Sequence, residues 1–143
     1  MENNEKYYIP NLQEFHIGFE YEWMREGDTS WTRTKMMENT SPICGVDAQR
    51  MNKYRVKYLD RWGIEDLGFS LEDEKNLINI YVIGDEHQGL YTLIHYKPTR
   101  LVEIYNNAGN KHEAHFTGII KNKTELKILL NQLRIPFKNN KHD

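Results

Sequence analysis

Hydrophobic and polar positions alternate without a break from Glu14 to Trp23. Aromatic or aliphatic side chains occupy every second position, and charged or small residues fill the positions between them. A period of two over ten residues predicts a β-strand with one buried face and one solvated face. We expect this strand at the centre of an antiparallel sheet.

Shorter runs rich in β-branched and aromatic residues predict the remaining strands. They are Trp31–Met37, Tyr54–Leu59, Leu77–Ile83, Leu90–Tyr96, Leu101–Tyr105 and His112–Ile120. Short loops join the last four, which predicts a meander. Glu38–Met51 contains proline and glycine without any period and is predicted to be a loop, while Leu71–Asn76 is interpreted as a charged connector.

Two segments carry helix signals. Asn122 is a good N-cap, with Glu125 at the spacing of a capping box, and one apolar stripe follows: Leu126, Leu129, Leu130 and Leu133. A shorter helix is expected between Asp60 as N-cap and Gly68 at its C-terminal end. The sequence thus predicts an α+β fold: a single domain over residues 1–143 with an antiparallel sheet of about six or seven strands. The amphipathic C-terminal helix packs on one face of the sheet, and residues 1–8 and 137–143 are frayed.

Composition narrows the class of protein. The net charge of −2 argues against general nucleic-acid binding. The chain has one cysteine, Cys44, so it can form neither an internal disulfide nor a zinc site built from several cysteines. A single cysteine is consistent with a reducing compartment. No apolar run reaches the length of a membrane span. We expect a soluble, cytoplasmic protein.

The polar row of the first strand raises the question of catalysis. Glu20 and Glu22 share a face, and with a histidine they would suit a metal-dependent hydrolase. Two other predicted strands carry same-face basic pairs: Arg33 with Lys35, and Arg55 with Lys57. Pairing of acidic and basic rows across strands is ordinary sheet stabilisation and is the favoured interpretation. We predict no catalytic residue, metal site or cofactor.

An aromatic content of 12% and the lack of a catalytic set favour a binding protein. For a nucleotide-like ligand, rings would stack on the base and cations would hold the phosphate. The predicted binding residues are Trp23, Trp31, Arg33, Arg55 and Lys57. Trp62 starts the short helix, where insertion into the core is favoured and exposure would instead indicate a contact surface.

Three segments together resemble a known group of sequences. They are Ile9–Trp23, Tyr54–Phe69 and Asn122–Leu133, and they are similar to small proteins of phages and mobile elements of Bacteroides-like bacteria. That group has no established activity, so the resemblance assigns no catalytic residue. The chain departs from the group at Trp62-Gly63, where acidic residues usually start the helix.

The resemblance implies a phage-type accessory protein in the host cytosol. Such a protein would counteract host defence by sequestering a nucleotide-like signal or by blocking a host protein. Besides the hydrolase, a structural or virion-associated protein remains an alternative, in which the sheet edge pairs with other copies and forms a homo-oligomer.

Overall fold

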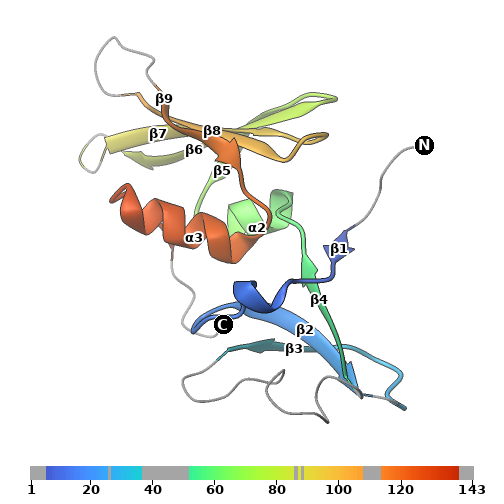
Figure 1. Cartoon of the computed structure of the whole chain (residues 1–143). Helices are drawn as coiled ribbons and strands as arrows, with labels where there is room; N and C mark the ends of the chain where they lie inside the picture. Colours follow the sequence, from blue (N-terminus) through green and yellow to red (C-terminus); the bar gives the residue numbers. More distant parts are fainter. Residues whose placement is uncertain are drawn as a thin grey trace. The chain divides into compact units, whose positions relative to one another are not determined.

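The computed structural model describes residues 6–25, 27–36, 52–85, 87, 89–107 and 114–138. The chain divides into two compact units, Met1–Tyr58 and Leu59–Asp143. Each unit has its own antiparallel sheet and its own hydrophobic core (Figure 1). The α+β class and the antiparallel pairing are confirmed. The expected single sheet is replaced by two sheets of four and five strands.

The smaller unit is built on a four-stranded sheet in the order β1-β4-β2-β3. Its strands are β1 (Tyr7–Tyr8), β2 (Glu20–Arg25), β3 (Thr32–Lys35) and β4 (Asn52–Lys57). The interior position of β2, between β4 and β3, agrees with the prediction. Tyr7 and Tyr8 pair with β4 and do not fray, whereas the predicted loop Glu38–Met51 and Cys44 lie outside the described residues.

The predicted strand Glu14–Trp23 is wrong in its first half. A 3-10 turn, η1 (Leu12–Glu14), comes first, and β2 starts only at Glu20. Between them Gly18 has φ +92°, a backbone conformation that favours glycine. Its N–H donates to the carbonyl of Met36 at 2.8 Å, and the Phe19 N–H donates to the carbonyl of His16. Because of this turn, the residues before Glu20 do not form an extended strand, although hydrophobic and polar positions alternate there.

The core of the smaller unit is small and aromatic. Phe19, Tyr21 and Val56 are buried, and Phe15 packs its ring edge-on at 5.0 Å from the rings of both Phe19 and Tyr21. Phe15 therefore reaches the predicted apolar face although it lies outside β2. Burial, with a smaller effect of Tyr54, raises the pKa of Tyr21 to about 12, so its hydroxyl stays protonated at neutral pH.

The larger unit is a five-stranded meander. Its strands follow chain order: β5 (Ser70–Glu74), β6 (Ile78–Asp85), β7 (Gly89–Tyr96), β8 (Leu101–Asn106) and β9 (Ala114–Ile119). The four predicted strands of the meander are confirmed. The interpretation of Leu71–Asn76 as a connector is wrong, because β5 pairs with β6 as an edge strand.

Both helices begin at the predicted caps. In α3 (Lys123–Gln132), the Asn122 side chain accepts from the Glu125 N–H at 2.8 Å, and the Glu125 carboxylate accepts from the Lys121 N–H. In α2 (Arg61–Asp66), the Asp60 carboxylate accepts from the Gly63 N–H at 2.9 Å. Gly68 follows the helix with φ +102°, as expected for a C-terminal glycine.

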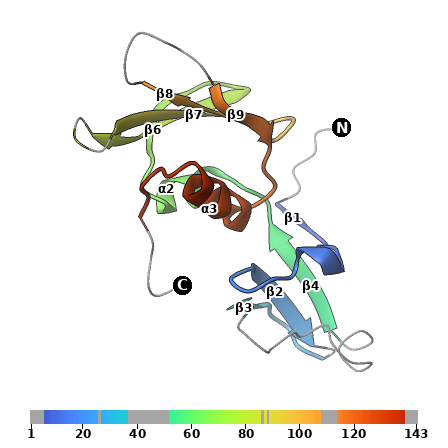
Figure 2. The same ribbon diagram turned by 60° about the vertical axis from the view of Figure 1, so that its left-hand side comes forward.

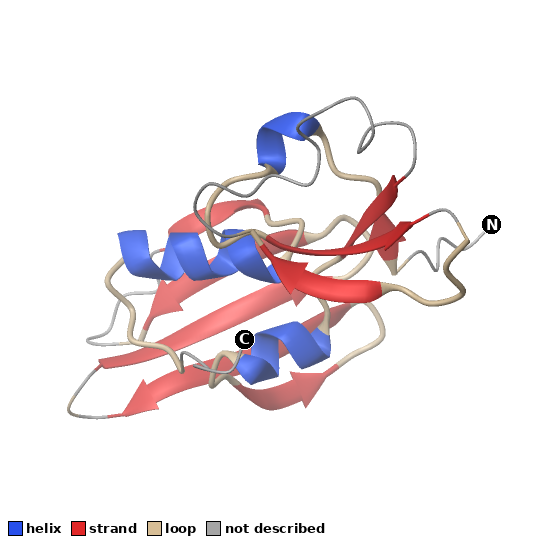
Figure 3. Ribbon diagram, turned by 90° about the horizontal axis from the view of Figure 1, so that it is seen from below, coloured by secondary structure: helices blue, strands red, loops and turns tan. Residues whose placement is uncertain are grey.

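Both helices cover the same face of the five-stranded sheet (Figures 1 and 3). The leucine stripe of α3 is confirmed, since Leu126 and Leu130 are completely buried and Leu129 nearly so. They pack with residues of α2 and of the inward strand positions into one core of fourteen buried side chains. Phe137 packs against this core and the Lys138 N–H donates to the carbonyl of Leu67, so the chain is still ordered at these two positions.

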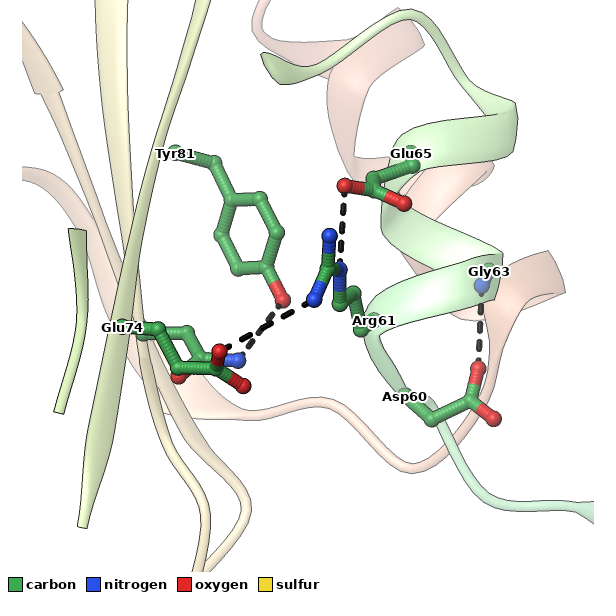
Figure 4. A network of polar contacts seen from close by, with 7 residues as sticks. Asp60, Arg61, Gly63, Glu65, Glu74 and Tyr81 are labelled. Atoms are coloured by element: carbon green, nitrogen blue, oxygen red, sulfur yellow. Dashed lines mark hydrogen bonds and ion pairs between the residues drawn. The ribbon is translucent and has the colours of Figure 1, made fainter. Parts of the chain in front are cut away.

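A charged side chain also ties α2 to the sheet (Figure 4). Arg61 on α2 lies 3.1 Å from Glu65 one turn later and 3.8 Å from Glu74 on β5. These ion pairs are partly exposed, so each contributes at most about 1 kcal/mol.

Trp62, beside Arg61, is 67% exposed, so the expected insertion of its side chain into the core is wrong. No described helix is long and apolar enough to cross a membrane.

Candidate functional site

Strand alternation gathers charged side chains on one face of the four-stranded sheet. The registers set Glu20 opposite Lys35, and Glu22 opposite both Arg33 and Arg55. We call this face, which lies opposite the aromatic core, the basic face. Its ring-bearing and charged members are Tyr7, Glu20, Glu22, Trp31, Arg33, Lys35, Lys53, Arg55 and Lys57. Five of these side chains are basic and two are acidic, so the face is cationic although the whole chain is not.

Glu22 occupies the centre of the basic face. Its Oε1 accepts from Nε of Arg55 at 2.7 Å and lies 2.7 Å from Nη2 of the same guanidinium. The two side chains are 21% and 26% exposed, so the pair is partly shielded from water. The predicted pairing of the acidic row with the basic rows is present here. The Glu22–Arg55 ion pair has a structural effect, because it fixes the guanidinium of Arg55 over the sheet.

The same guanidinium lies between two aromatic rings. Its central carbon is 3.7 Å from the ring centroid of Tyr7 and 4.2 Å from that of Trp31. Each such cation–π contact contributes about 0.5–1 kcal/mol at a partly exposed position. Tyr7 belongs to β1, Arg55 to β4, and Trp31 directly precedes β3. Three separate segments thus hold one cation and two rings in a fixed arrangement.

Two further cations of the basic face project into solvent. Arg33 and Lys53 are exposed, and neither forms an ion pair within the part of the chain that the structure describes. Lys35 and Lys57, by contrast, each have an interaction with another group. The face therefore combines a pre-positioned guanidinium with exposed charges beside it, an arrangement that suits an anionic ligand.

The structure brings four of the five predicted binding residues together: Trp31, Arg33, Arg55 and Lys57. Trp23 lies on the opposite face. It directly follows Glu22 in β2, and successive side chains of a strand point to opposite faces of the sheet. There it packs against the aromatic core and has the guanidinium carbon of Arg25 5.2 Å from its ring centroid. Trp23 does not share a site with Arg55.

Sequence reasoning missed Tyr7. It lies in a strand of only two residues, and two residues give no periodic signal. The register of β1 with β4, Tyr7 opposite Lys57, places its ring on the basic face. The one available hint was the Tyr7-Tyr8 pair itself, which is a favourable composition for a strand.

The carboxylates proposed for a hydrolase serve other purposes in the described residues. Glu22 is bound to Arg55, and the Nδ1 of His16 lies 3.0 Å from the carbonyl oxygen of Ile17. Across residues 6–25, 27–36, 52–85, 87, 89–107 and 114–138, no group of three His, Cys, Asp or Glu side chains is placed to hold a metal ion. The geometry of these residues does not assemble the hydrolase site.

A second group of polar side chains is buried in the larger unit. Asn79 and His95 are cross-strand neighbours, 3% and 4% exposed, and Asn79 donates to the Tyr81 hydroxyl at 3.2 Å. Asn79 Oδ1 and His95 Nε2 have no hydrogen-bond partner among the described atoms. Desolvation lowers the pKa of His95 to about 4, so the ring is neutral at pH 7. This cluster lies inside the core, away from solvent.

No protein-family model, curated protein or solved structure matches the chain. The resemblance to small phage proteins therefore stays a prediction.

Proposed function

We propose that the chain is a non-enzymatic binding protein that holds a nucleotide-like ligand on the basic face. The observation that supports this proposal is the stack of Tyr7, Arg55 and Trp31. Flat, rigid rings and guanidinium planes are the surfaces on which bases stack, and base–aromatic stacking contributes about 1–3 kcal/mol per base.

The charges beside the stack supply the second half of the recognition. Arg33 and Arg55 lie on strands that flank β2, so their Cα atoms are about 10 Å apart, two strand spacings. Long side chains at that separation can bind different phosphates of one ligand. Lys53 lies two residues before Arg55 in β4, on the same face, and adds a third cation.

The biological role in this proposal is sequestration of a nucleotide signal used in host defence, by a phage-type protein in the host cytosol. The resemblance to phage proteins motivates that part. Sequestration requires affinity without turnover, and a cationic face around which the described residues assemble no metal-binding group suits that requirement.

The proposal is tested by calorimetric titration of the full chain with ATP and with a cyclic dinucleotide, using inorganic phosphate as the reference anion. We expect Arg55→Gln to weaken nucleotide binding about tenfold or more, and Arg33→Gln to weaken it several-fold. Lys138→Gln, an exposed charge change in the larger unit, is the matched control and should leave affinity unchanged.

Arg55 also supports the sheet, so its variant must be checked for folding by circular dichroism. Arg33 is exposed and unpaired among the described residues, so its variant separates binding from stability. Equal affinities for the parent, Arg33→Gln and Trp31→Leu would contradict the proposal, as would equal binding of phosphate and nucleotide.

A further inference from the structure

Strand β6 lacks the alternation expected of a strand with one solvated face. Its outward positions are Ile78, Ile80 and Val82, and its inward positions include the polar Asn79. Antiparallel sheets that face water usually have polar outward positions, whereas strands covered on both faces are apolar throughout. The helices α2 and α3 cover only the inward face (Figure 2). The pattern of β6 is that of a strand covered on its outer face as well.

The strand registers extend this apolar character across the sheet. Ile78, Tyr96, Leu101 and Ile119 are consecutive partners from β6 to β9, and Ile80 lies opposite Ile94 in the next row. We call these six side chains, together with Glu103, the outer face. None of them packs against the buried core of the unit, and Ile119 is 62% exposed.

The carboxylate of Glu103 lies among these apolar side chains. The same face also carries Asp73, which lies beside Ile80 on the edge strand β5 and whose carboxylate is 3.7 Å from Nζ of Lys75. Glu103 is the partner of Ile94 in β7 and Thr117 in β9. Its Oε1 accepts from the Tyr96 hydroxyl at 2.8 Å and from the Tyr105 hydroxyl at 3.2 Å. Its Oε2 has no partner within the described part of the chain. Oε2 of Glu103 is thus an acceptor, flanked by two aromatic rings, that a molecule bound on the outer face can use.

The two tyrosines keep their role as donors over a wide pH range. The hydrogen bond to Glu103 is the main cause that raises the pKa of Tyr96, and desolvation followed by the charge of Glu103 raises that of Tyr105. Both hydroxyls therefore remain protonated at neutral pH, and Glu103 remains oriented by them.

The charge on the outer face selects among possible occupants. A second copy of the chain would bring two Glu103 carboxylates into one apolar interface, and burying unpaired charge is costly. Lys75, at the β5 edge of this face, already forms an ion pair with Asp73. A partner that offers a lysine or arginine would satisfy Oε2, and Tyr96 and Tyr105 would flank the cation. Five strands spaced about 4.8 Å apart give a surface wide enough for a helix about 10 Å across.

We propose that the outer face docks a helical segment of a partner protein whose apolar side chains cover the isoleucines and whose lysine or arginine pairs with Glu103. This interface belongs to the larger unit and is separate from the nucleotide-binding role of the basic face. Affinity comes from the apolar rows, and selectivity for a basic partner comes from Glu103.

The test is a nuclear magnetic resonance titration of the isotope-labelled full chain with a synthetic amphipathic helix of leucine and lysine, about four turns long. A peptide with glutamate in place of lysine is the control ligand. We expect shifts centred on Ile80, Ile94 and Glu103 with the basic peptide only. Glu103→Gln keeps an acceptor for the tyrosines but removes the charge, and it should weaken binding about tenfold.

Glu72→Gln makes the same charge change on the exposed edge strand β5 and should alter the affinity less than twofold. The proposal is overturned if the basic peptide does not bind, if its shifts lie elsewhere, or if Glu103→Gln and Glu72→Gln bind it equally. It is also overturned if the chain is a dimer in solution that Ile94→Glu converts to monomer, because a second copy then covers the face.

Discussion

The two sheets of this chain expose faces of opposite chemistry. The basic face of the four-stranded sheet carries charges on nearly every position and one cation fixed between two rings. The outer face of the five-stranded sheet carries β-branched side chains around the carboxylate of Glu103. The difference shows that similar antiparallel pairing can present a charged, mainly basic surface or a mainly apolar surface. The residues at alternate positions decide which one results.

The two cores differ as well. Among the described residues, fourteen buried side chains make the core of the larger unit, from β6, β7, β8, both helices and the segments that adjoin them, whereas three make the core of the smaller unit. A small core contributes little stability by itself. We therefore expect the stability of the smaller unit to depend more on its ring contacts and on the Glu22–Arg55 ion pair of the basic face.

The largest expected effect is in the core of the larger unit. Leu130→Ala removes a completely buried side chain of α3 and should lower the free energy of unfolding by about 2–5 kcal/mol. Chemical denaturation monitored at residues 59–143 measures this loss. Leu133→Ala, a partly buried position at the end of the same helix, should cost clearly less, and equal losses would contradict the assignment of α3 as the main cover of this sheet.

The second effect is a pH dependence caused by His95. Burial lowers its pKa from 6.5 to about 4; the charge of Asp60 opposes the shift, and Lys97 and Arg100 assist it. Because the folded chain holds the ring neutral, stability is complete above about pH 6.5 and falls as the pH drops toward 4. The loss over this window is on the order of 3 kcal/mol.

Unfolding free energies measured between pH 7 and pH 4 test this prediction. His95→Leu should remove the part of the pH dependence that falls between pH 6.5 and pH 4. It should also raise stability at neutral pH, because the unpartnered Nε2 is gone. The exposed His115→Gln is the control and should keep the slope of the parent.

The smallest expected effect on stability is in the smaller unit. Arg55→Gln removes the ring stack and leaves Glu22 partly buried without its partner, which should cost about 1–2 kcal/mol. Arg55→Lys keeps the charge but not the planar stack, so it should recover only part of the loss. Thermal unfolding followed by tryptophan fluorescence measures both, and full recovery by lysine would show that the stack contributes nothing.

Many features of the fold were predictable from residue spacing. The meander, both helix caps and the leucine stripe of α3 follow from period, capping chemistry and turn residues, and these local signals were sufficient. The matching of the acidic row with basic residues on neighbouring strands also followed from same-face spacing. The register sets Glu22 opposite Arg33 and Arg55, and the ion pair forms with Arg55. The position of Trp23 on the opposite face was implied by the same spacing, since it is adjacent to Glu22 in the strand.

The rest depended on contacts between segments distant in sequence. Strand β5 has a single apolar inward residue, Leu71, because an edge strand needs little else, so its sequence reads as a charged connector. The division into two sheets, and the place of Tyr7 beside Arg55, depend on pairing partners that no local pattern specifies. A single-domain organisation over residues 1–143 stays a prediction.

The most direct test of the basic face as a ligand site is native mass spectrometry of the full chain purified gently from bacterial cells. Parent protein and Arg33→Gln should be compared, because Arg33 is exposed and its loss should not disturb the fold. If the basic face is a ligand site, we expect a parent species that carries the additional mass of a nucleotide, and a variant species in which that mass is reduced or lost. A parent chain that is bare, or an additional mass retained equally by the variant, would contradict it.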